Sequence, residues 1–270
     1  MRIALTGTGA LGIRTARLLL AEPGLEALGV AGTSSREGDS RLRPVRQLSD
    51  WDALVSDAHP NAAPDIDQAL QAGLPLVAWA DDRQTVAAAR QRQQSFREAG
   101  SALLVGCNLR SGIGPALAAH QAAQADEVLE TVLGWTESGR PLRRGEAVPF
   151  PDPLGPLWAR PSRLPYPSDS RQLAAPADGP WAGVVARLNA VVNDGVVTRT
   201  VGVADDELHL QAIALAAGAL AVLDGAYRPG LQWVEQGAAA YLERALSLGL
   251  EVAAFTEQHN AAIRPGKPPP

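Results

Sequence analysis

The sequence predicts an α/β protein in which an N-terminal, doubly wound parallel sheet is followed by a second α+β domain of mixed sheet and helices. Three observations support this prediction. A glycine-rich turn joins a strand-like run to a helix-like run at the N-terminus, similar strands and helices then alternate, and a hairpin pattern precedes alanine-rich helices in the second half. Regular alternation of strands and helices is typical of a parallel sheet with helices on both faces.

In the first half, apolar runs bounded by glycine, proline and polar residues predict strands at 2–6, 25–31, 51–57, 74–79 and 102–106, with a shorter strand at 44–46. The intervening segments predict helices from the glycine turn to residue 20, at 64–72 and at 82–98. Gly73 is expected to end the second of these helices, because glycine readily adopts the left-handed conformation found at helix ends.

The second half begins with a crossover at 108–115 and a helix to about residue 125. It is then expected to contain an exposed strand at 128–135, paired strands at 181–192 and 195–203, and helices at 207–223 and about 231–247. Asp194-Gly195 favours a hairpin, and the acids of Asp205-Asp206-Glu207 suit the positive start of the next helix. Residues 138–181 form a long Pro-, Gly- and Arg-rich loop, which is usually either functional, such as a lid, or disordered.

The N-terminal turn reads Gly7-Thr8-Gly9-Ala10-Leu11-Gly12. In a dinucleotide-binding turn of the Rossmann type, the first glycine permits a tight turn, the second lets the backbone approach a pyrophosphate, and the third lets the helix pack closely on the strand. The exposed N–H groups and the dipole at the helix start attract the phosphates. We expect these six residues to bind a dinucleotide; the alternative is a glycine-rich turn that binds nothing.

The end of the second strand indicates which dinucleotide is bound. An NAD site usually has Asp or Glu there to bind the ribose hydroxyls, whereas this chain has Thr33-Ser34-Ser35-Arg36. Three hydroxyls and a guanidinium suit a 2′-phosphate, which a carboxylate would repel. The sequence therefore favours NADP(H) over NAD(H). The alternative is a solvated loop in which Arg36 makes no specific contact, and the nearby Glu37 and Asp39 leave that alternative open.

Composition argues against other classes of function. The 270 residues carry a net charge of −5 without a dominant basic patch, which argues against nucleic-acid binding. No apolar run approaches the roughly twenty residues of a membrane span. A single cysteine, Cys107, excludes an internal disulfide and a cysteine-based zinc cluster, and no metal-ligand spacing is present. The only lysine is Lys267 in the tail. A cytoplasmic protein whose folded body has no lysine for acid, base or Schiff-base chemistry is the simplest expectation.

The layout resembles the oxidoreductase superfamily that includes dihydrodipicolinate reductases, diaminopentanoate dehydrogenases and saccharopine-dehydrogenase-like proteins. The resemblance rests on the glycine turn with its polar second-strand end, on residues 106–113, and on a sheet-plus-helix second domain. Residues 106–113 look like the Asn-x-Ser-x-Gly stretch at which the reductases cross between domains, with one extra residue between Asn108 and Ser111. The resemblance covers the whole chain in outline, with specific matches only in the first twelve residues. It implies the fold and a dinucleotide cofactor.

The resemblance supplies no catalytic residue. The paired-histidine and lysine segment of the reductases and their Ser-Gly-Thr motif are missing, as is the Glu-Lys-Pro of the glucose-fructose oxidoreductase type. Cys107 follows a buried strand without an obvious base, so it is interpreted as a small apolar residue. His209 is expected to pair with the preceding acids. The arginines Arg140, Arg143 and Arg144 would suit a carboxylate substrate.

Ligands of a doubly wound sheet bind beyond the carboxyl ends of its strands. The backbone at Asp57 and Ala58 is therefore expected beside the nicotinamide ribose, and Asn108 is expected in the cofactor site. Trp79 either packs against the nicotinamide or fills the core beneath it. His59 is the best-placed group to move a proton during hydride transfer; alternatively, it only orders its turn.

We therefore expect residues 1–118 to form an NADP-binding domain, residues 119–260 a substrate and dimerisation domain, and residues 261–270 a proline-rich tail. The expected function is that of an NADP(H)-dependent oxidoreductase that transfers hydride to or from a small amino-acid-like carbonyl, imine or amine. Its expected partners are a small-molecule substrate, such as a carboxylate or an amino acid, and a second copy of the chain in a dimer. The alternative is a non-catalytic NADP-binding sensor or scaffold, which the missing lysine and histidine-pair motifs favour.

Overall fold

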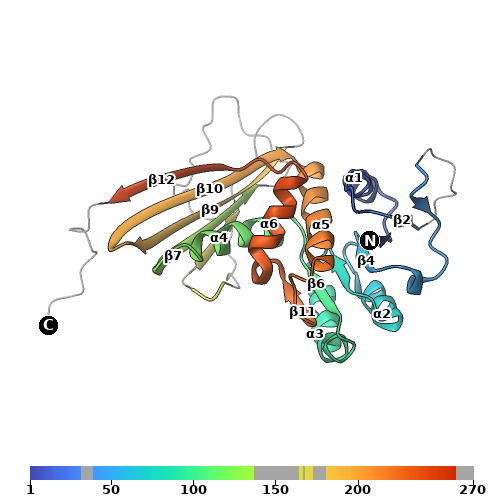
Figure 1. The fold of residues 1–270 in the computed structure, drawn as a ribbon. Helices are drawn as coiled ribbons and strands as arrows, with labels where there is room; N and C mark the ends of the chain where they lie inside the picture. The colour runs from blue at the N-terminus through green and yellow to red at the C-terminus, as the bar shows by residue number, and fades with distance from the viewer. Residues whose placement is uncertain (32–38, 137–163, 167, 173–180, 260–270) are drawn as a thin grey trace.

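The computed structural model contains two sheets, and it describes residues 1–31, 39–136, 164–166, 168–172 and 181–259 (Figure 1). The first sheet has seven strands in the order β11-β6-β5-β4-β1-β2-β3, and all neighbouring strands are parallel. Its strands are β1 (Arg2–Leu5), β2 (Ala27–Val30), β3 (Leu42–Arg43), β4 (Ala53–Ser56), β5 (Leu76–Ala78), β6 (Ala102–Val105) and β11 (Gly230–Trp233).

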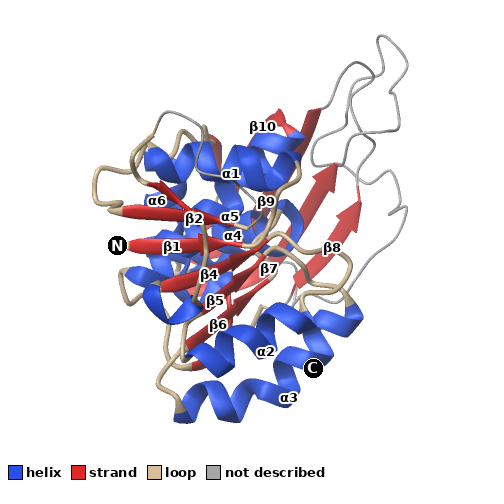
Figure 2. Cartoon of the chain, turned by 90° about the vertical axis from the view of Figure 1, so that its right-hand side faces the viewer, coloured by secondary structure: helices blue, strands red, loops and turns tan. Residues whose placement is uncertain are grey.

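Helices cover both faces of this sheet. The helices α1 (Ala10–Leu20) and α5 (Glu207–Leu223) pack together on one face, and α2 (Ala63–Ala72) and α3 (Arg83–Glu98) pack together on the other (Figures 1 and 2). Successive strand residues enter different cores: Val77 packs in the core of α1 and α5, and Leu76 packs in that of α2 and α3. Burial on both faces is typical of parallel sheets, and the predicted doubly wound architecture is confirmed.

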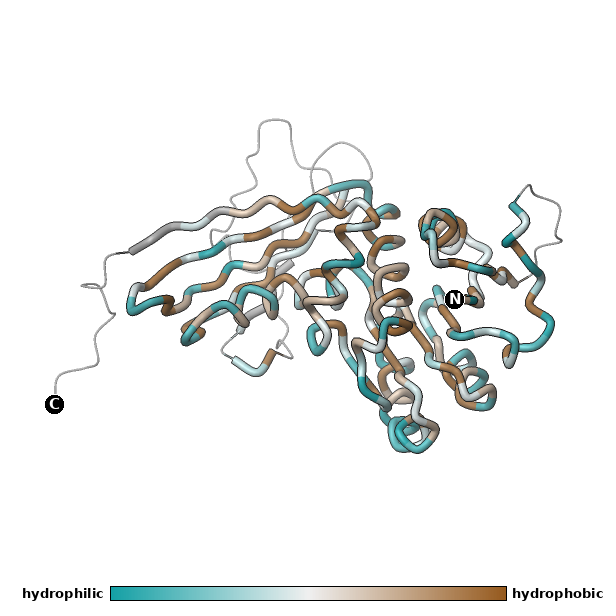
Figure 3. The backbone as a smooth tube through the Cα atoms, viewed as in Figure 1, coloured by the Kyte–Doolittle hydropathy of each residue, from teal (hydrophilic) through white to brown (hydrophobic). Residues whose placement is uncertain are grey.

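Several helix ends follow from the local sequence. Gly73 ends α2 in the left-handed conformation, with φ +69°, as predicted. Asp82 and Asp206 begin α3 and α5, and each carboxylate accepts a hydrogen bond from a backbone N–H of the first helical turn. Because α5 is apolar on almost every side, it is buried nearly continuously from Leu210 to Val222 (Figure 3).

The second sheet has five strands in the order β12-β10-β9-β7-β8. They are β7 (Glu127–Thr136), β8 (Ser168–Gln172), β9 (Trp181–Val192), β10 (Gly195–Asp206) and β12 (Ala253–His259). The β7–β8 pair is parallel and the other pairs are antiparallel, so the predicted mixed sheet is confirmed. Asn193 and Asp194 link β9 to β10 with φ angles of 49° and 62°, and positive values at both positions are typical of a tight type I′ hairpin.

Two further helices join the second sheet to the first. The helix α4 (Gly114–Ala122) packs on β7 and β9, and α6 (Ala238–Ser247) packs on both α4 and α5. One large apolar core is therefore shared by α1, α4, α5 and α6 and continues between the two sheets.

The structure corrects four local predictions. Residues 231–233, predicted to begin a helix, belong to β11 instead, because Gly230 has φ +97° and the segment pairs with β6; a 3₁₀ turn at Val234–Gly237 precedes α6. The strand predicted at 44–46 lies at Leu42–Arg43, where it pairs with β2. The helix predicted to reach about residue 125 ends at Ala122. The strand predicted as exposed has a buried second half, where Trp135 is 2% exposed.

Some predictions lie outside the described residues, namely those for Thr33–Arg36, for most of the 138–181 loop and for the 261–270 tail. Among the helices that the structure describes, none is long and apolar enough to cross a membrane.

Candidate functional site

The amino end of α1 is open to solvent. Thr8, Gly9 and Ala10 are exposed, and Gly9 precedes the helix without any side-chain cap. The first turn of α1 contains no acidic residue, and a Cβ built on Gly9 would meet no atom within 4 Å. This arrangement leaves room for an anionic group at the positive end of the helix dipole.

The other two glycines of the turn allow close packing. A Cβ on Gly12 would overlap the carbonyl of Gly7, so the third glycine lets α1 lie directly against the end of β1. A Cβ on Gly7 would overlap the carboxyl group of Asp57. Gly7 does not have a positive φ, so its role here is to admit the Asp57 side chain rather than to provide a left-handed turn.

Asp57 is half-buried directly after β4, and its carboxyl group lies between Gly7 and the start of α1. Burial raises the pKa of this carboxyl above its usual value, and the negative charge of Asp65 raises it further. Hydrogen bonds from the backbone N–H groups of Asp57 and Gly12 act in the opposite direction. The sequence predicted the backbone of Asp57 near the cofactor, but it gave no sign that the side chain would lie against the glycine turn.

A second carboxylate lies behind Asp57. Asp65 of α2 accepts hydrogen bonds from the hydroxyl of Thr6, at 3.2 Å, and from the hydroxyl of Ser56. Ser56 in turn accepts from the backbone N–H of Ala58 at 3.3 Å. These bonds fix the carboxyl ends of β1 and β4 to α2, and sequence reasoning did not find them.

His59 and Trp79 come together at the ends of β4 and β5. The exposed His59 ring stands edge-on to Trp79, with 4.8 Å between the ring centroids and 77° between the planes. The indole N–H of Trp79 donates to Oε1 of Gln211 on α5 at 2.8 Å. Gln211 Oε1 also accepts from the backbone N–H of Leu109 at 3.1 Å. Trp79 is thus held from the α5 side and is only partly buried.

Asn108 organises the turn after β6. Its Oδ1 accepts from the backbone N–H of Ser111 at 2.7 Å, and its Nδ2 donates to the carbonyl of Trp79 at 3.0 Å. It begins a π-helical turn at Leu109–Ile113, a rare geometry that is frequent at functional sites. Both ends of the Asn108 amide therefore hold backbone in place.

Charged groups cluster beside this turn. Arg110 lies 3.2 Å from the Asp81 carboxylate, which also accepts a hydrogen bond from the hydroxyl of Ser111. The Arg110 guanidinium carbon lies 6.0 Å from the centre of the Trp135 ring, within the range of a cation–π contact. The cluster links β5, the π-helical turn and β7, and the sequence did not predict it.

His209 has the carboxylate neighbour that the sequence predicted. Its Nε2 lies 3.9 Å from Oδ2 of Asp205, and its Nδ1 accepts a hydrogen bond from Nε of Arg14 at 3.4 Å. Arg14 is on α1, so this contact joins the starts of α1 and α5. Cys107 is fully buried, and burial raises the pKa of its thiol, which agrees with its interpretation as an apolar residue.

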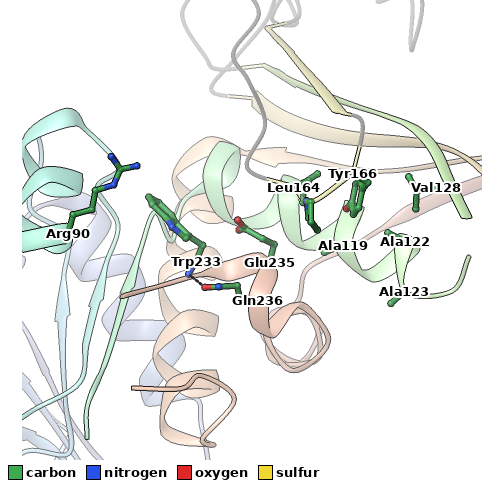
Figure 4. A pocket seen from close by; sticks show the side chains of 11 residues that line it. Arg90, Ala119, Ala122, Ala123, Val128, Leu164, Tyr166, Trp233, Glu235 and Gln236 are labelled. Atoms are coloured by element: carbon green, nitrogen blue, oxygen red, sulfur yellow. Dashed lines mark hydrogen bonds between the residues drawn. The ribbon is translucent and has the colours of Figure 1, made fainter. Parts of the chain in front are cut away.

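A cavity of about 750 Å³ adjoins the β11 end of the sheet (Figure 4). Figure 4 shows Trp233 and Glu235 between Arg90 on one side and Tyr166 on the other, with alanines of α4 forming the apolar wall. Trp233 pairs with Val105, the last residue of β6, and its ring approaches Gly106. Burial raises the pKa of Tyr166, and the nearby charge of Glu235 adds to this effect.

The comparisons with known proteins identify the fold. No family model matches the sequence, and no curated protein matches it. Saccharopine dehydrogenase (L-Glu forming) from Saccharomyces cerevisiae superposes with a TM-score of 0.66 at 10% identity, over 95% of this chain and 99% of that chain. The homospermidine synthase of Legionella pneumophila, in complex with NAD, gives a TM-score of 0.58 at 7% identity, over 100% of this chain and 94% of that chain.

The DAP dehydrogenase of C. glutamicum, in complex with DAP, gives a TM-score of 0.56 at 14% identity, over 86% of this chain and 92% of that chain. At these identities the similarity establishes the fold, including its second domain. The resemblance to saccharopine-dehydrogenase-like proteins expected from the sequence is confirmed at that level.

Proposed function

We propose that the protein is an NADP(H)-dependent oxidoreductase that transfers hydride to or from a small amino-acid-like carbonyl, imine or amine. The observation that carries this proposal is the amino end of α1, which directly follows Gly9, has no side-chain cap and is open to solvent at the carboxyl edge of a seven-stranded parallel sheet. The solved structures of the same fold add support, because saccharopine dehydrogenase and DAP dehydrogenase are named as dehydrogenases and the homospermidine synthase contains NAD.

The residues present fit a dinucleotide. In the bound state the N–H groups of Ala10 and Leu11 would face the pyrophosphate, and Thr33-Ser34-Ser35-Arg36 would hold the 2′-phosphate. Ala58 and Trp79 would flank the nicotinamide half, which supplies the hydride. His59 would move the accompanying proton, since it is exposed beside Trp79.

We assign the substrate to the cavity next to β11. A dinucleotide with its pyrophosphate at β1 and its 2′-phosphate beyond β2 extends its nicotinamide toward β4 and β5, and β6 and β11 follow in the same direction. Arg90 and Glu235 line opposite parts of the cavity, with Trp233 between them (Figure 4). A guanidinium and a carboxylate on either side of an aromatic ring complement a zwitterionic amino acid.

One observation favours a second candidate, a non-catalytic NADP-binding protein of the same fold. The polar side chains at the ends of β5 and β6 are engaged within the protein: Asn108 donates to the backbone carbonyl of Trp79, and Arg110 pairs with Asp81. Groups held in this way support the shape of the cleft rather than proton transfer. A binding role needs only the cofactor half of the site.

Nucleotide titration tests the cofactor assignment. Wild-type protein, Arg36→Ala and Gly9→Ala would be titrated with NADPH and NADH, with binding followed by nucleotide fluorescence. We expect NADPH to bind more tightly than NADH, and Arg36→Ala to weaken NADPH about tenfold or more while leaving NADH unchanged, because charge-assisted hydrogen bonds to the 2′-phosphate are lost. Absence of binding by either nucleotide would exclude the oxidoreductase.

Gly9→Ala separates binding from folding. The added methyl has free space in the protein and an ordinary φ of −77°, so the melting temperature should be unchanged while both nucleotides bind more weakly. Gly12→Ala is the matched contrast, since its methyl would overlap the Gly7 carbonyl and should destabilise the fold itself. Loss of stability in Gly9→Ala would contradict the open site.

Turnover distinguishes the two candidates. Oxo acids with ammonia, and amino acids with NADP⁺, would be screened by the absorbance of NADPH. An active enzyme should lose kcat in His59→Gln with unchanged NADPH affinity, whereas Glu235→Gln and Arg90→Ala should raise KM. Tight NADPH binding without turnover of any such substrate would favour the sensor or scaffold.

We further propose that residues 1–118 and 119–260 form the cofactor and substrate domains of a cytoplasmic dimer. Because β11 and α5 lie on the first sheet, the second domain contributes to both halves of the molecule. Sedimentation equilibrium gives the oligomeric state directly, and a monomer at micromolar concentration would exclude the dimer.

A further inference from the structure

Asp57 occupies an unexpected place for an acid. Its carboxyl group lies on Gly7 and approaches Gly12, at the amino end of the helix where the proposed cofactor would bring its pyrophosphate. The turn is built around it, because any side chain at position 7 would overlap the carboxyl group. The protein thus supplies one negative charge of its own to the helix dipole, from the neighbouring strand.

Among the residues that the structure describes, the groups next to Asp57 in the chain or named in its electrostatics include no cation that pairs with its carboxylate. Asp65 on α2 is a second acid, and its charge acts on Asp57. On α1, the nearest cation in the sequence is Arg14, but its Nε donates to His209 of α5. His59, two residues after Asp57, stands against Trp79. The backbone N–H groups of Asp57 and Gly12 are the groups that stabilise the negative charge.

A pyrophosphate and an ionised Asp57 would therefore compete for the same positive helix end. A neutral carboxylic acid at this position would instead have a hydrogen to donate to a phosphate oxygen. The backbone of Asp57 directly follows β4, which is buried between β1 and β5, so the acid is held beside the turn.

We propose that Asp57 makes dinucleotide binding depend on proton uptake: the carboxyl group remains beside the glycine turn and binds the pyrophosphate in its protonated form. Asp57 is then a residue that determines cofactor affinity. This inference rests on the proposed function, because it needs a dinucleotide at α1.

The sign of the effect follows from linkage. A bound pyrophosphate raises the pKa of Asp57 above its value in the free protein, which burial and Asp65 have already raised. Between these two pKa values, binding takes up a proton and affinity falls as pH rises, by up to about tenfold per pH unit for one proton. Below the pKa of the free protein, Asp57 is protonated before and after binding and adds no pH dependence to the affinity.

The test measures proton uptake on the intact protein. NADP⁺ would be titrated calorimetrically between pH 5 and 8, in pairs of buffers with different ionisation enthalpies, with wild type, Asp57→Asn and Asp65→Asn. The 2′-phosphate also titrates near pH 6, but equally in all three proteins, so differences between them isolate the side chains. Asp65→Asn is the matched control, since it also removes one carboxylate, but from α2 behind Asp57 and not from beside the glycine turn.

We expect wild type to take up more protons than Asp57→Asn, and Asp57→Asn to bind NADP⁺ at least tenfold more tightly at pH 8 with a flatter pH profile. Asp65→Asn should keep the wild-type slope. Equal proton uptake and equal slopes in wild type and Asp57→Asn would overturn the inference and leave the cofactor site standing, as would weaker binding by Asp57→Asn at pH 8. If no protein binds NADP⁺ at any pH, the cofactor site itself is wrong, and this inference is overturned with it.

Should Asp57→Asn fail to fold, proton uptake is measured with the Asp57 side chain in place. Proton uptake by wild type can be compared with the value that the 2′-phosphate alone produces, by repeating the titration with NAD⁺, which lacks that group. Uptake of protons with NAD⁺ between pH 5 and 8 that persists in both His59→Gln and His209→Gln supports Asp57, and its absence overturns the inference.

Discussion

Gly218 of α5 provides a sharp test of how the second half of the chain packs on the first sheet. A Cβ at this position would lie 2.7 Å from Sγ of Cys107 and 3.0 Å from Cγ1 of Val77. Both neighbours are fully buried, so neither can move without disturbing the core. Overpacking of this kind costs about 1–3 kcal/mol. The helix preference of alanine over glycine offsets about 1 kcal/mol of that cost. Gly218→Ala should therefore lower the free energy of unfolding by up to about 2 kcal/mol.

The effect of Gly218→Ala on the free energy of unfolding should change sign when the Cys107 sulfur is removed. Cys107→Ala alone should cost about 1–2 kcal/mol, because it removes buried atoms and leaves a small cavity. In that background the methyl added by Gly218→Ala enters the vacated space, and the helix preference adds about 1 kcal/mol of stability. The double-mutant cycle should then give a favourable coupling of about 1–3 kcal/mol.

Urea unfolding of the four proteins, followed by tryptophan fluorescence, measures these differences if the m-value stays constant. Coupling is the decisive quantity because each single variant also changes the unfolded state. If the two substitutions add within about 0.5 kcal/mol, the contact between α5 and the end of β6 is not as close as described, and the reasoning fails.

Three further outcomes are expected from other contacts and from the burial of Cys107. Gln211→Met should lower the free energy of unfolding in urea by about 2–4 kcal/mol, because the N–H donors of Trp79 and Leu109 lose their shared acceptor. Gln211→Glu keeps an acceptor and should lower it less. Equal losses in the two variants would contradict this role of Gln211. Asp206→Ala should lower the stability by about 1 kcal/mol and Asp206→Asn by much less, and an Asn variant as unstable as the Ala variant would exclude the cap. At pH 8 the native thiol of Cys107 should resist iodoacetamide, because burial raises its pKa and blocks access, and labelling should begin only at urea concentrations that unfold the protein; rapid labelling of the native state would refute this.

Local signals in the sequence were sufficient for much of the fold. The glycine turn, the end of α2 at Gly73, the β9–β10 hairpin and the start of α5 at Asp206 are each determined by a few adjacent residues. Such features depend on backbone conformation and capping, which the local sequence specifies directly. The alternation of strands and helices then indicated a parallel sheet.

The failures came from contacts between distant segments. Residues 230–233 pair with β6 across more than one hundred positions of sequence, and nothing local distinguishes them from the start of the next helix. Burial of Trp135 depends in part on Arg110 and on the core shared with α4 and α5. In these places tertiary packing overrides propensity, as is common for short strands.

The candidate site divides in the same way. The positions of the glycine turn, His59 and Trp79 at strand ends could be inferred from chain order. That Asp57 lies on Gly7 could not, because it requires the side chain of one strand end to cross to the next. The sequence also could not show that Gln211 accepts hydrogen bonds from Trp79 and Leu109, because these partners are known only once α5 is placed against β5 and β6.

The return of the chain to the first sheet has a consequence for the site. After the second sheet, the chain supplies α5, which covers the face formed with α1, and then β11, which extends the sheet next to β6. His209 and Gln211 of α5 contact Arg14 of α1 and Trp79 after β5, which lie on the sides of the proposed pyrophosphate and nicotinamide positions. Because α5 directly follows β10, the second sheet is connected without a linker to the helix that holds the cofactor side. Together with α4, which leads from β6 to β7, and α6, which leads from β11 to β12, α5 is one of three helices through which the second sheet is attached to the first.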